Sequence, residues 1–298
     1  MIYSLRHRTT YDYEDDVTFA RCVLRLTPRS SATQTVLKSI INVTPKPSAT
    51  REGRGPFGEQ TLTVIIDRPH DELVIEARST VDVHAPRVGD PADSPPWEVV
   101  RSLGYETASL APEGPAPYLY PTRRTPTVPA ITDYARTSFT PGRPIIEAGA
   151  DLMTRMRADF VYDPEATNVS TTVREAFAER HGVCQDFAHI MISGLRGLGL
   201  AAAYVSGYLR TVPPPGKPRL EGADATHAWV SIWCGEARGW ISFDPTNAVL
   251  VENDHIVLAV GRDYSDVAPI DGVILAPGVQ TLKVEVAVIP NDEQATAA

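Results

Sequence analysis

The chain has 298 residues and a mass of 32.4 kDa, enough for one large domain or two ordinary ones. Hydrophobic residues make up 43% and charged residues 22%, close to the average of soluble globular proteins, so a largely disordered chain is excluded. The net charge is −9, and no cluster of basic residues is longer than Arg123-Arg124. We therefore expect neither a nucleic-acid partner nor a membrane partner. The oligomeric state is not readable from the sequence.

The cellular compartment is predicted from three features. No apolar run approaches the roughly 20 residues that a membrane-spanning helix needs. Charged residues near the N-terminus precede any apolar segment, unlike a secretory signal. The three cysteines, Cys22, Cys184 and Cys234, form no CxxC pair, which disfavours a disulfide scaffold or a zinc ribbon. We expect a cytoplasmic protein, in which a lone cysteine is either a core residue or a nucleophile.

The first part of the chain, residues 1–85, is predicted to be a β-rich domain with antiparallel strands. Residues 86–130 contain ten prolines, which cannot donate hydrogen bonds to a sheet, and we interpret this segment as a surface linker. The strands expected in the first domain lie within Phe19–Thr27, Val36–Val43, Thr61–Ile66 and Leu73–Ala77.

Residues 131–298 are predicted to form a second, mixed domain, so the chain as a whole is expected to be α+β. Apolar residues at three- and four-residue spacings predict helices over Ile145–Phe160 and Gln185–Gly197, with a shorter helix near Val173–Phe177. The expected strands are Ala202–Thr211, Ala228–Trp233, Gly239–Phe243, Val257–Val260 and Thr281–Ile289.

Cys184 lies at the predicted start of the clearest helix, directly after the helix-breaking Gly182. A helix N-terminus carries partial positive charge and free N–H groups, which favour a thiolate and can stabilise a developing oxyanion. The alternative is a buried structural cysteine, since free cysteine is among the most buried residue types. Both interpretations stay open on this segment alone.

A base for such a thiolate is available on a predicted hairpin. His227 stands at the entrance of one strand, and Asp244 ends the next. We place the centre of the hairpin between Glu236 and Ala237. His227 then lies opposite Thr246, and Asp244 is its diagonal neighbour, with Cβ atoms about 7–8 Å apart or less. The carboxylate is thereby expected to hold the imidazole ring and to leave its other nitrogen for the cysteine.

Simpler interpretations compete with each of these roles. A histidine before a strand is often a surface or turn residue, and an aspartate before a proline is often a turn former. A metal site that uses His181, Cys184 and His189 is disfavoured, because Cys184 and His189 are five residues apart, which places them about 140° apart around a helix. Trp229, beside His227, is either core or a wall of the cleft.

Three segments together resemble the catalytic core of the bacterial transglutaminase-like superfamily: Gly182–Ala188, Thr226–Val230 and Phe243–Asn247. The stretches His7–Tyr13 and Leu24–Arg29 resemble the β domain that precedes this core in bacterial members. The resemblance implies a papain-like arrangement, in which a helix headed by the cysteine packs on an antiparallel sheet that carries the histidine and the aspartate. The segments Tyr204–Tyr208 and Val260–Pro269 extend the resemblance over nearly the whole chain.

The resemblance also implies roles for individual residues. Cys184 corresponds to the nucleophile, His227 to the general base and then acid, and Asp244 to the residue that orients the histidine. The side chain of the oxyanion hole is not identified by the motifs, and Tyr162 and Gln185 are the candidates beside the Cys184 backbone N–H. No match is found to the acidic calcium sites of the animal enzymes, so no cofactor and no metal is expected.

The implied chemistry is acyl transfer from a peptide or glutamine-type amide through a cysteine thioester. A cysteine peptidase or amidase acting on a peptide or protein substrate is our leading hypothesis, because water is always present. A true transglutaminase is the first alternative, since the same thioester serves both and loops such as Pro213–Asp224 decide access. The second alternative is an inactive peptide-binding scaffold on the same fold.

Overall fold

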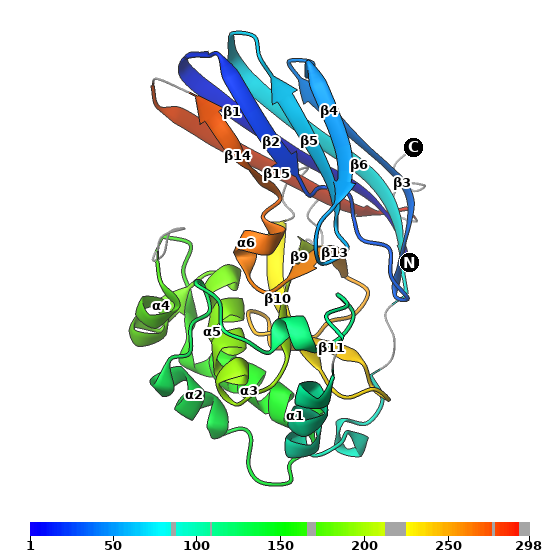
Figure 1. Ribbon diagram of the computed structural model, residues 1–298, viewed down its shortest axis with the longest axis vertical. Helices are drawn as coiled ribbons and strands as arrows, with labels where there is room; N and C mark the ends of the chain where they lie inside the picture. The colour runs from blue at the N-terminus through cyan, green and yellow to red at the C-terminus, as the bar shows by residue number, and fades with distance from the viewer. Residues whose placement is uncertain (85–87, 108, 166–170, 212–224, 276–277, 292–298) are drawn as a thin grey trace, which may run out of the picture.

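The computed structural model describes residues 1–84, 88–107, 109–165, 171–211, 225–275 and 278–291. A β-sandwich lies at one end, and helices packed around a five-stranded sheet form the other (Figure 1). The fold is therefore α+β with mostly antiparallel sheets, as the sequence predicts. Among the described residues, no helix has the length and apolar character needed to cross a bilayer.

The β-sandwich consists of two four-stranded antiparallel sheets. Strand order is β15-β1-β6-β3 in one sheet and β14-β2-β5-β4 in the other. Alternate residues of the strands point between the sheets and form an apolar core, because successive side chains of a strand face opposite sides. The strands are β1 (Ile2–Val17), β2 (Phe19–Leu24), β3 (Gln34–Thr44), β4 (Ala49–Arg54), β5 (Gln60–Ile66), β6 (His70–Val83), β14 (Ile270–Leu275) and β15 (Gln280–Pro290).

Two strands of the sandwich come from the end of the chain. β14 pairs with β2, and β15 pairs with β1 over eleven residue pairs from Tyr3↔Pro290 to Tyr13↔Gln280. The range 131–298, expected to form the catalytic domain, therefore also supplies strands to the N-terminal β region. The alternation of residues predicts a strand over Thr281–Ile289, but it carries no information about which strand will be its partner.

The proline-rich segment 86–130 is more than a surface linker. It contains the helix α1 (Trp97–Glu106), from which Trp97 and Val100 are buried in the main core. Tyr118 and Val128 are buried in the same core. Proline is compatible with the starts of short helices, where its missing N–H is not needed, so a proline-rich segment with regular apolar residues can fold into the domain. Two short 3₁₀ turns, η1 (Pro91–Asp93) and η2 (Ala116–Tyr118), complete it.

The second part of the molecule is built on a five-stranded antiparallel sheet of order β12-β11-β10-β9-β13. Its strands are β9 (Ala202–Leu209), β10 (Ala225–Trp233), β11 (Trp240–Asp244), β12 (Val249–Leu250) and β13 (His255–Gly261). The other elements are α2 (Pro129–Arg136), α3 (Ile145–Asp159), α4 (Val173–Glu179), α5 (Cys184–Gly197), α6 (Tyr264–Val267) and the short parallel pair β7 (Val161–Tyr162) and β8 (His181–Gly182).

The helix α5 is the central buried helix, and every residue from Asp186 to Arg196 is buried. Its first turn is capped by Asp186, whose carboxylate accepts a hydrogen bond of 2.9 Å from the Val183 N–H. Gly182 makes this cap possible, because a Cβ at that position would lie 2.7 Å from Asp186 Oδ2. The cap therefore fixes where the helix begins and places Cys184 at its first position.

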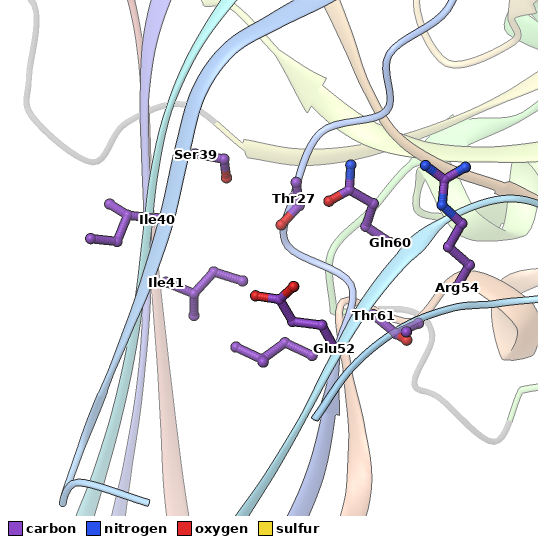
Figure 2. Close-up of a pocket in the computed structure, with 10 residues that line it drawn as sticks. Thr27, Ser39, Ile40, Ile41, Glu52, Arg54, Gln60 and Thr61 are labelled. Atoms are coloured by element: carbon purple, nitrogen blue, oxygen red, sulfur yellow. The ribbon is translucent and has the colours of Figure 1, made fainter. Parts of the chain in front are cut away.

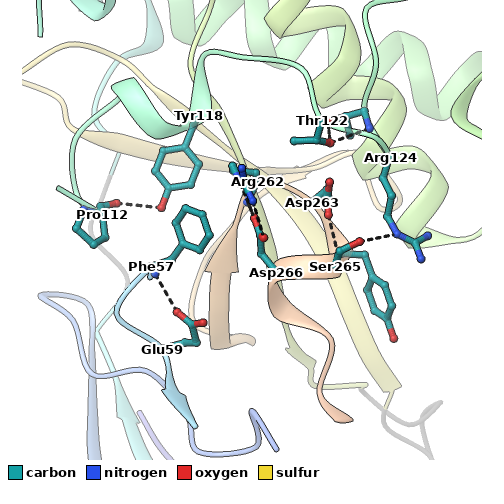
Figure 3. Close-up of polar contacts among 12 residues, drawn as sticks. Phe57, Glu59, Pro112, Tyr118, Thr122, Arg124, Arg262, Asp263, Ser265 and Asp266 are labelled. Carbon is teal, nitrogen blue, oxygen red and sulfur yellow. Dashed lines mark hydrogen bonds and ion pairs between the residues drawn. The ribbon is translucent and has the colours of Figure 1, made fainter. Parts of the chain in front are cut away.

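The two parts of the molecule share a boundary with apolar and polar contacts. Tyr208 and Ile256 of the core sheet pack with Tyr3 and Leu5 of the sandwich in one buried cluster. Tyr208 Oη also lies 2.9 Å from His7 Nδ1. Figure 3 shows a second contact region, where the sandwich residue Phe57 lies near Tyr118 and Arg262; the Phe57 and Tyr118 ring centroids are 5.6 Å apart. The sheet that carries the candidate site is thus packed on both sides.

A cavity of about 510 Å³ opens between the edges of the two sandwich sheets (Figure 2). Ser39, Ile40 and Ile41 of β3 line one side, and Glu52 and Gln60 belong to the strands on the other. Both β3 and β4 are edge strands, so the cavity marks the open side of the sandwich.

Candidate active site

The hairpin β10–β11 has the register that the sequence predicts. Val230 pairs with Phe243, and Trp233 pairs with Trp240, which corresponds to a centre between Glu236 and Ala237. At the end of the hairpin away from its turn, the same register brings the start of β10 next to the end of β11. The apolar residues of both strands anchor the hairpin in the core, so a slip by one residue would expose them.

Asp244 is fully buried and accepts five hydrogen bonds. Its Oδ2 accepts from His227 Nε2 at 2.8 Å, from His255 Nε2 at 3.1 Å and from Asn247 Nδ2 at 2.7 Å. Its Oδ1 accepts from the backbone N–H groups of Thr246 at 3.0 Å and Asn247 at 3.2 Å. Oδ2 thus binds the two histidines, and Oδ1 binds the backbone of the turn that follows. The contacts of Asp244 are therefore those of a turn former as well as those of a partner for His227.

The charged form of Asp244 is strongly favoured. Burial raises the pKa of this carboxyl, but the hydrogen bonds from His227, His255 and Asn247 outweigh burial and hold the pKa below its usual range. A buried carboxylate with all of its acceptor sites used is a rigid anchor for its donors.

His227 is almost fully buried and lies between Asp244 and Cys184. Burial lowers the pKa of His227, but hydrogen bonds to the Asp244 carboxylate and to Cys184 outweigh it and raise the pKa to about 9. Because Nε2 donates to Asp244, Nδ1 is the ring nitrogen left for the thiol. Cys184 is half-buried, whereas Cys22 and Cys234 are buried. The structure therefore brings the sulfur, the imidazole and the carboxylate into one group.

The three residues expected around the cleft have different environments. Tyr162 lies on β7, where it pairs with Gly182, and its side chain is about half exposed. The buried part of the side chain and the nearby Cys184 raise the pKa of its hydroxyl. Gln185 is half-buried beside Cys184. Trp229 is completely buried, so it does not form an exposed wall of the cleft. Its ring packs edge-on against His255, with centroids 5.2 Å apart, and it also lies beside His227, with centroids 6.0 Å apart. Trp229 therefore packs against both histidines.

Gly207 explains how the indole of Trp229 fits. This residue of β9 pairs with His227 in the sheet. A Cβ at Gly207 would lie 2.5 Å from Trp229 Cη2 and would overlap the carbonyl oxygen of Ile256. Only glycine leaves this space, so the packing behind the histidines depends on it.

Sequence reasoning missed two participants, His255 and Asn247. His255 is buried at the start of β13, a strand that joins the sheet by pairing with β9, and no local pattern predicts that it reaches Asp244. Asn247 follows Asp244 by three residues in the turn, and that spacing is the only signal in the sequence that points to it. Both donate to the oxygen that His227 uses.

The residues best placed to hold a metal are also in this group. The ligand atoms of His227, Asp244 and His255 all lie within 4.8 Å of one another. Imidazole and carboxylate form a donor set that suits zinc. However, both Nε2 atoms already donate to Asp244, and the thiol of Cys184 lies beside His227. His189, considered as a ligand from sequence, instead accepts from the Tyr264 N–H at 3.2 Å.

Comparison with known proteins agrees with this fold. Residues 3–82 match the bacterial transglutaminase-like N-terminal region, and residues 132–245 match the transglutaminase-like superfamily. The chain belongs to the transglutaminase-like superfamily. Uncharacterized proteins of Mycobacterium tuberculosis and Mycobacterium leprae are 40% and 32% identical to it, over 98% and 94% of this chain and 94% and 95% of theirs.

A solved structure from Cytophaga hutchinsonii, described as a candidate cysteine protease, has the same fold. It matches with a TM-score of 0.74 and 21% identity, over 98% of this chain and 92% of that chain. At this level of identity the likeness concerns the fold alone. The β-sandwich and the core sheet thus occur together in both proteins.

Proposed function

We propose that the protein is a thiol-dependent acyl-transfer enzyme with a Cys184–His227–Asp244 triad. The observation that carries the proposal is the position of His227 between a buried carboxylate and the thiol at the start of α5. At neutral pH a pKa of about 9 leaves His227 protonated. A protonated imidazole beside a cysteine stabilises the thiolate.

The reaction follows from these positions. The sulfur of Cys184 attacks the carbonyl carbon of an amide, a C–S bond forms, and the carbonyl oxygen becomes an oxyanion. The C–N bond then breaks while His227 passes its proton to the leaving nitrogen. Neutral His227 next takes a proton from water or from an amine, which attacks the thioester and releases Cys184. Asp244 keeps the ring oriented and stabilises its charged form throughout.

Backbone N–H groups are the first candidates for the oxyanion hole. Cys184 is the first residue of α5, and the N–H groups of a first turn have no partner within the helix. Tyr162 and Gln185 are the candidate side chains, because Tyr162 is close enough to Cys184 for the two groups to interact electrostatically and Gln185 is its neighbour in sequence. Trp229 is too deeply buried for this role.

We propose hydrolysis of peptide or glutamine-type amides, as a cysteine peptidase or amidase, without a cofactor. Transamidation is the alternative, because an amine acceptor can resolve the same thioester. The loop Pro213–Asp224, expected to control access, lies outside the described residues. A cytoplasmic location is part of the proposal and is supported by three free thiols, which suit a reducing compartment.

The test is incubation of the protein with glutamine-containing peptides, with and without an added primary amine, followed by mass spectrometry. Cleavage or a one-unit mass gain indicates hydrolysis, and incorporation of the amine indicates transamidation. Cys184→Ala is expected to abolish each product while the circular dichroism spectrum stays unchanged. Full turnover by that variant refutes the proposal, and peptide binding without any product favours the scaffold.

A further inference from the structure

The short strand β7 has a free outer edge. It pairs in parallel with β8, with Val161 opposite His181 and Tyr162 opposite Gly182. Among the described residues this sheet holds only these two strands, so β7 has a neighbour on one side and none on the other. A strand edge without a neighbour presents main-chain N–H and C=O groups to which another extended chain can add.

The main chain of β7 directs successive residues to opposite sides. The N–H of Val161 donates to the carbonyl oxygen of Arg180 at 2.8 Å, and the N–H of Asp163 donates to that of Gly182 at 3.0 Å. Because hydrogen bonding alternates along a strand, the N–H and C=O of Tyr162 point away from β8. No described residue forms a hydrogen bond with either of these two groups. Tyr162 therefore offers one donor and one acceptor, next to each other, at the free edge.

This free edge is beside the candidate nucleophile. Tyr162 pairs with Gly182, and Cys184 follows Gly182 by two residues at the start of α5. The Tyr162 side chain is also close enough to Cys184 for the two groups to interact electrostatically, so it lies on the face of β7 that is directed toward the thiol. The side chains of Val161 and Asp163, one position before and one after, lie on the opposite face. Val161 and Tyr162 are 54% and 48% exposed, so both are accessible to a bound chain.

We propose that the acyl-donor peptide binds as an extended strand, antiparallel to β7, and exchanges two main-chain hydrogen bonds with Tyr162. One peptide residue then donates its N–H to the Tyr162 carbonyl oxygen and accepts from the Tyr162 N–H, as in a hydrogen-bonded pair of an antiparallel sheet. Residues that lie opposite each other have their side chains on the same face, so the side chain of this peptide residue points to the side of Cys184. A glutamine at this position extends its amide toward the sulfur.

The two side chains on the other face of β7 select the residues that flank this glutamine. In the antiparallel direction, the residue after the glutamine lies opposite Val161, and the residue before it lies opposite Asp163. An apolar side chain packs on the exposed Val161, and a basic side chain pairs with the carboxylate of Asp163, which the Glu165 N–H holds at 2.9 Å. The inference rests on the proposed function, because it assigns a substrate class to the same site: extended peptides with the order basic, glutamine, apolar.

The test removes single main-chain hydrogens from the peptide. Fluorescein-labelled Ser-Lys-Gln-Leu-Ser is titrated with the Cys184→Ala variant, and binding is followed by fluorescence anisotropy. N-methylation of the glutamine removes the hydrogen that bonds to the Tyr162 carbonyl oxygen and should weaken binding about tenfold. N-methylation of the leucine is the matched control, because the N–H of that residue points away from β7, and it should leave the affinity nearly unchanged. Equal effects of the two methyl groups, or binding of none of these peptides, refute binding at this edge.

The order of the flanking residues gives a second measurement. Ser-Leu-Gln-Lys-Ser has the same composition and charge as the first peptide and should bind about fivefold more weakly. In the Cys184→Ala background, Val161→Ser should abolish the gain in affinity that leucine gives over serine at the position after the glutamine. Val273→Ser, which changes an exposed valine of β14 in the sandwich, is the matched control and should preserve that gain. Equal affinity for the two orders, or loss of the gain in both variants, overturns the assignment.

Turnover by the protein with Cys184 intact is measured with the same peptides. Selective binding without turnover supports peptide binding at the edge of β7 and rejects the enzyme. Turnover of both methylated peptides at equal kcat/KM rejects binding at this edge and leaves the enzyme.

Discussion

Asp244→Asn tests whether the buried carboxylate controls the histidine. The substitution keeps the volume of the side chain but replaces one acceptor oxygen with an amide donor. Three donors converge on Oδ2, from His227, His255 and Asn247, so an amide nitrogen there would face hydrogen-bond donors. The pKa of His227, now about 9 against an ordinary 6.5, should fall, since burial is then opposed mainly by the contact with Cys184.

The magnitude follows from that shift. A change of 2.5 units at about 1.36 kcal/mol per unit corresponds to about 3 kcal/mol, shared between the contacts of His227 with Asp244 and with Cys184. If most of it comes from the carboxylate, turnover should fall about one-hundred-fold. The donors left without acceptors should also lower the free energy of unfolding by about 1–3 kcal/mol.

The assay is the rate of Cys184 alkylation by iodoacetamide between pH 5 and 10, read by mass spectrometry of the labelled peptide. The wild-type rate should show a transition near pH 9 and the variant a transition at a clearly lower pH. Urea unfolding measures stability in parallel, and Asp82→Asn on β6 is the control for the same chemical change in the sandwich. A folded Asp244→Asn variant that keeps the transition near pH 9 contradicts the reasoning.

Four further outcomes are expected. Iodoacetamide should label Cys184 faster than the two buried cysteines at neutral pH; equal rates argue against an activated thiol. The stabilisation from the raised pKa of His227 should be complete below about pH 6.5 and lost as pH rises through about 9, which urea unfolding against His227→Gln measures. His255→Phe should shift the alkylation transition upward, because Asp244 then accepts one hydrogen bond fewer; an unshifted transition indicates a purely structural residue. Gly207→Ala should lower the free energy of unfolding, measured with urea, by about 1–3 kcal/mol and should reduce turnover. A variant as stable as the wild type would contradict the tight packing of Trp229 against Gly207.

Local sequence patterns predicted the elements that present the candidate site. The start of α5 follows from the glycine before it and the apolar spacing after it, both of which act over one or two turns. The register of the hairpin β10–β11 follows from two apolar strands and a short connection. These are interactions between residues close in sequence, so the Cys184, His227 and Asp244 positions are readable from the chain itself.

Tertiary structure alone decided the partners that come from distant parts of the chain. β14 and β15 complete the sandwich, the proline-rich segment packs into the main core, and β13 delivers His255 to the carboxylate of Asp244. A period of two or of 3.6 residues says which face of an element is apolar, but it does not say which other apolar face will cover it. That choice depends on the shape and burial of the whole assembly, and so only the folded chain places the second histidine beside the first.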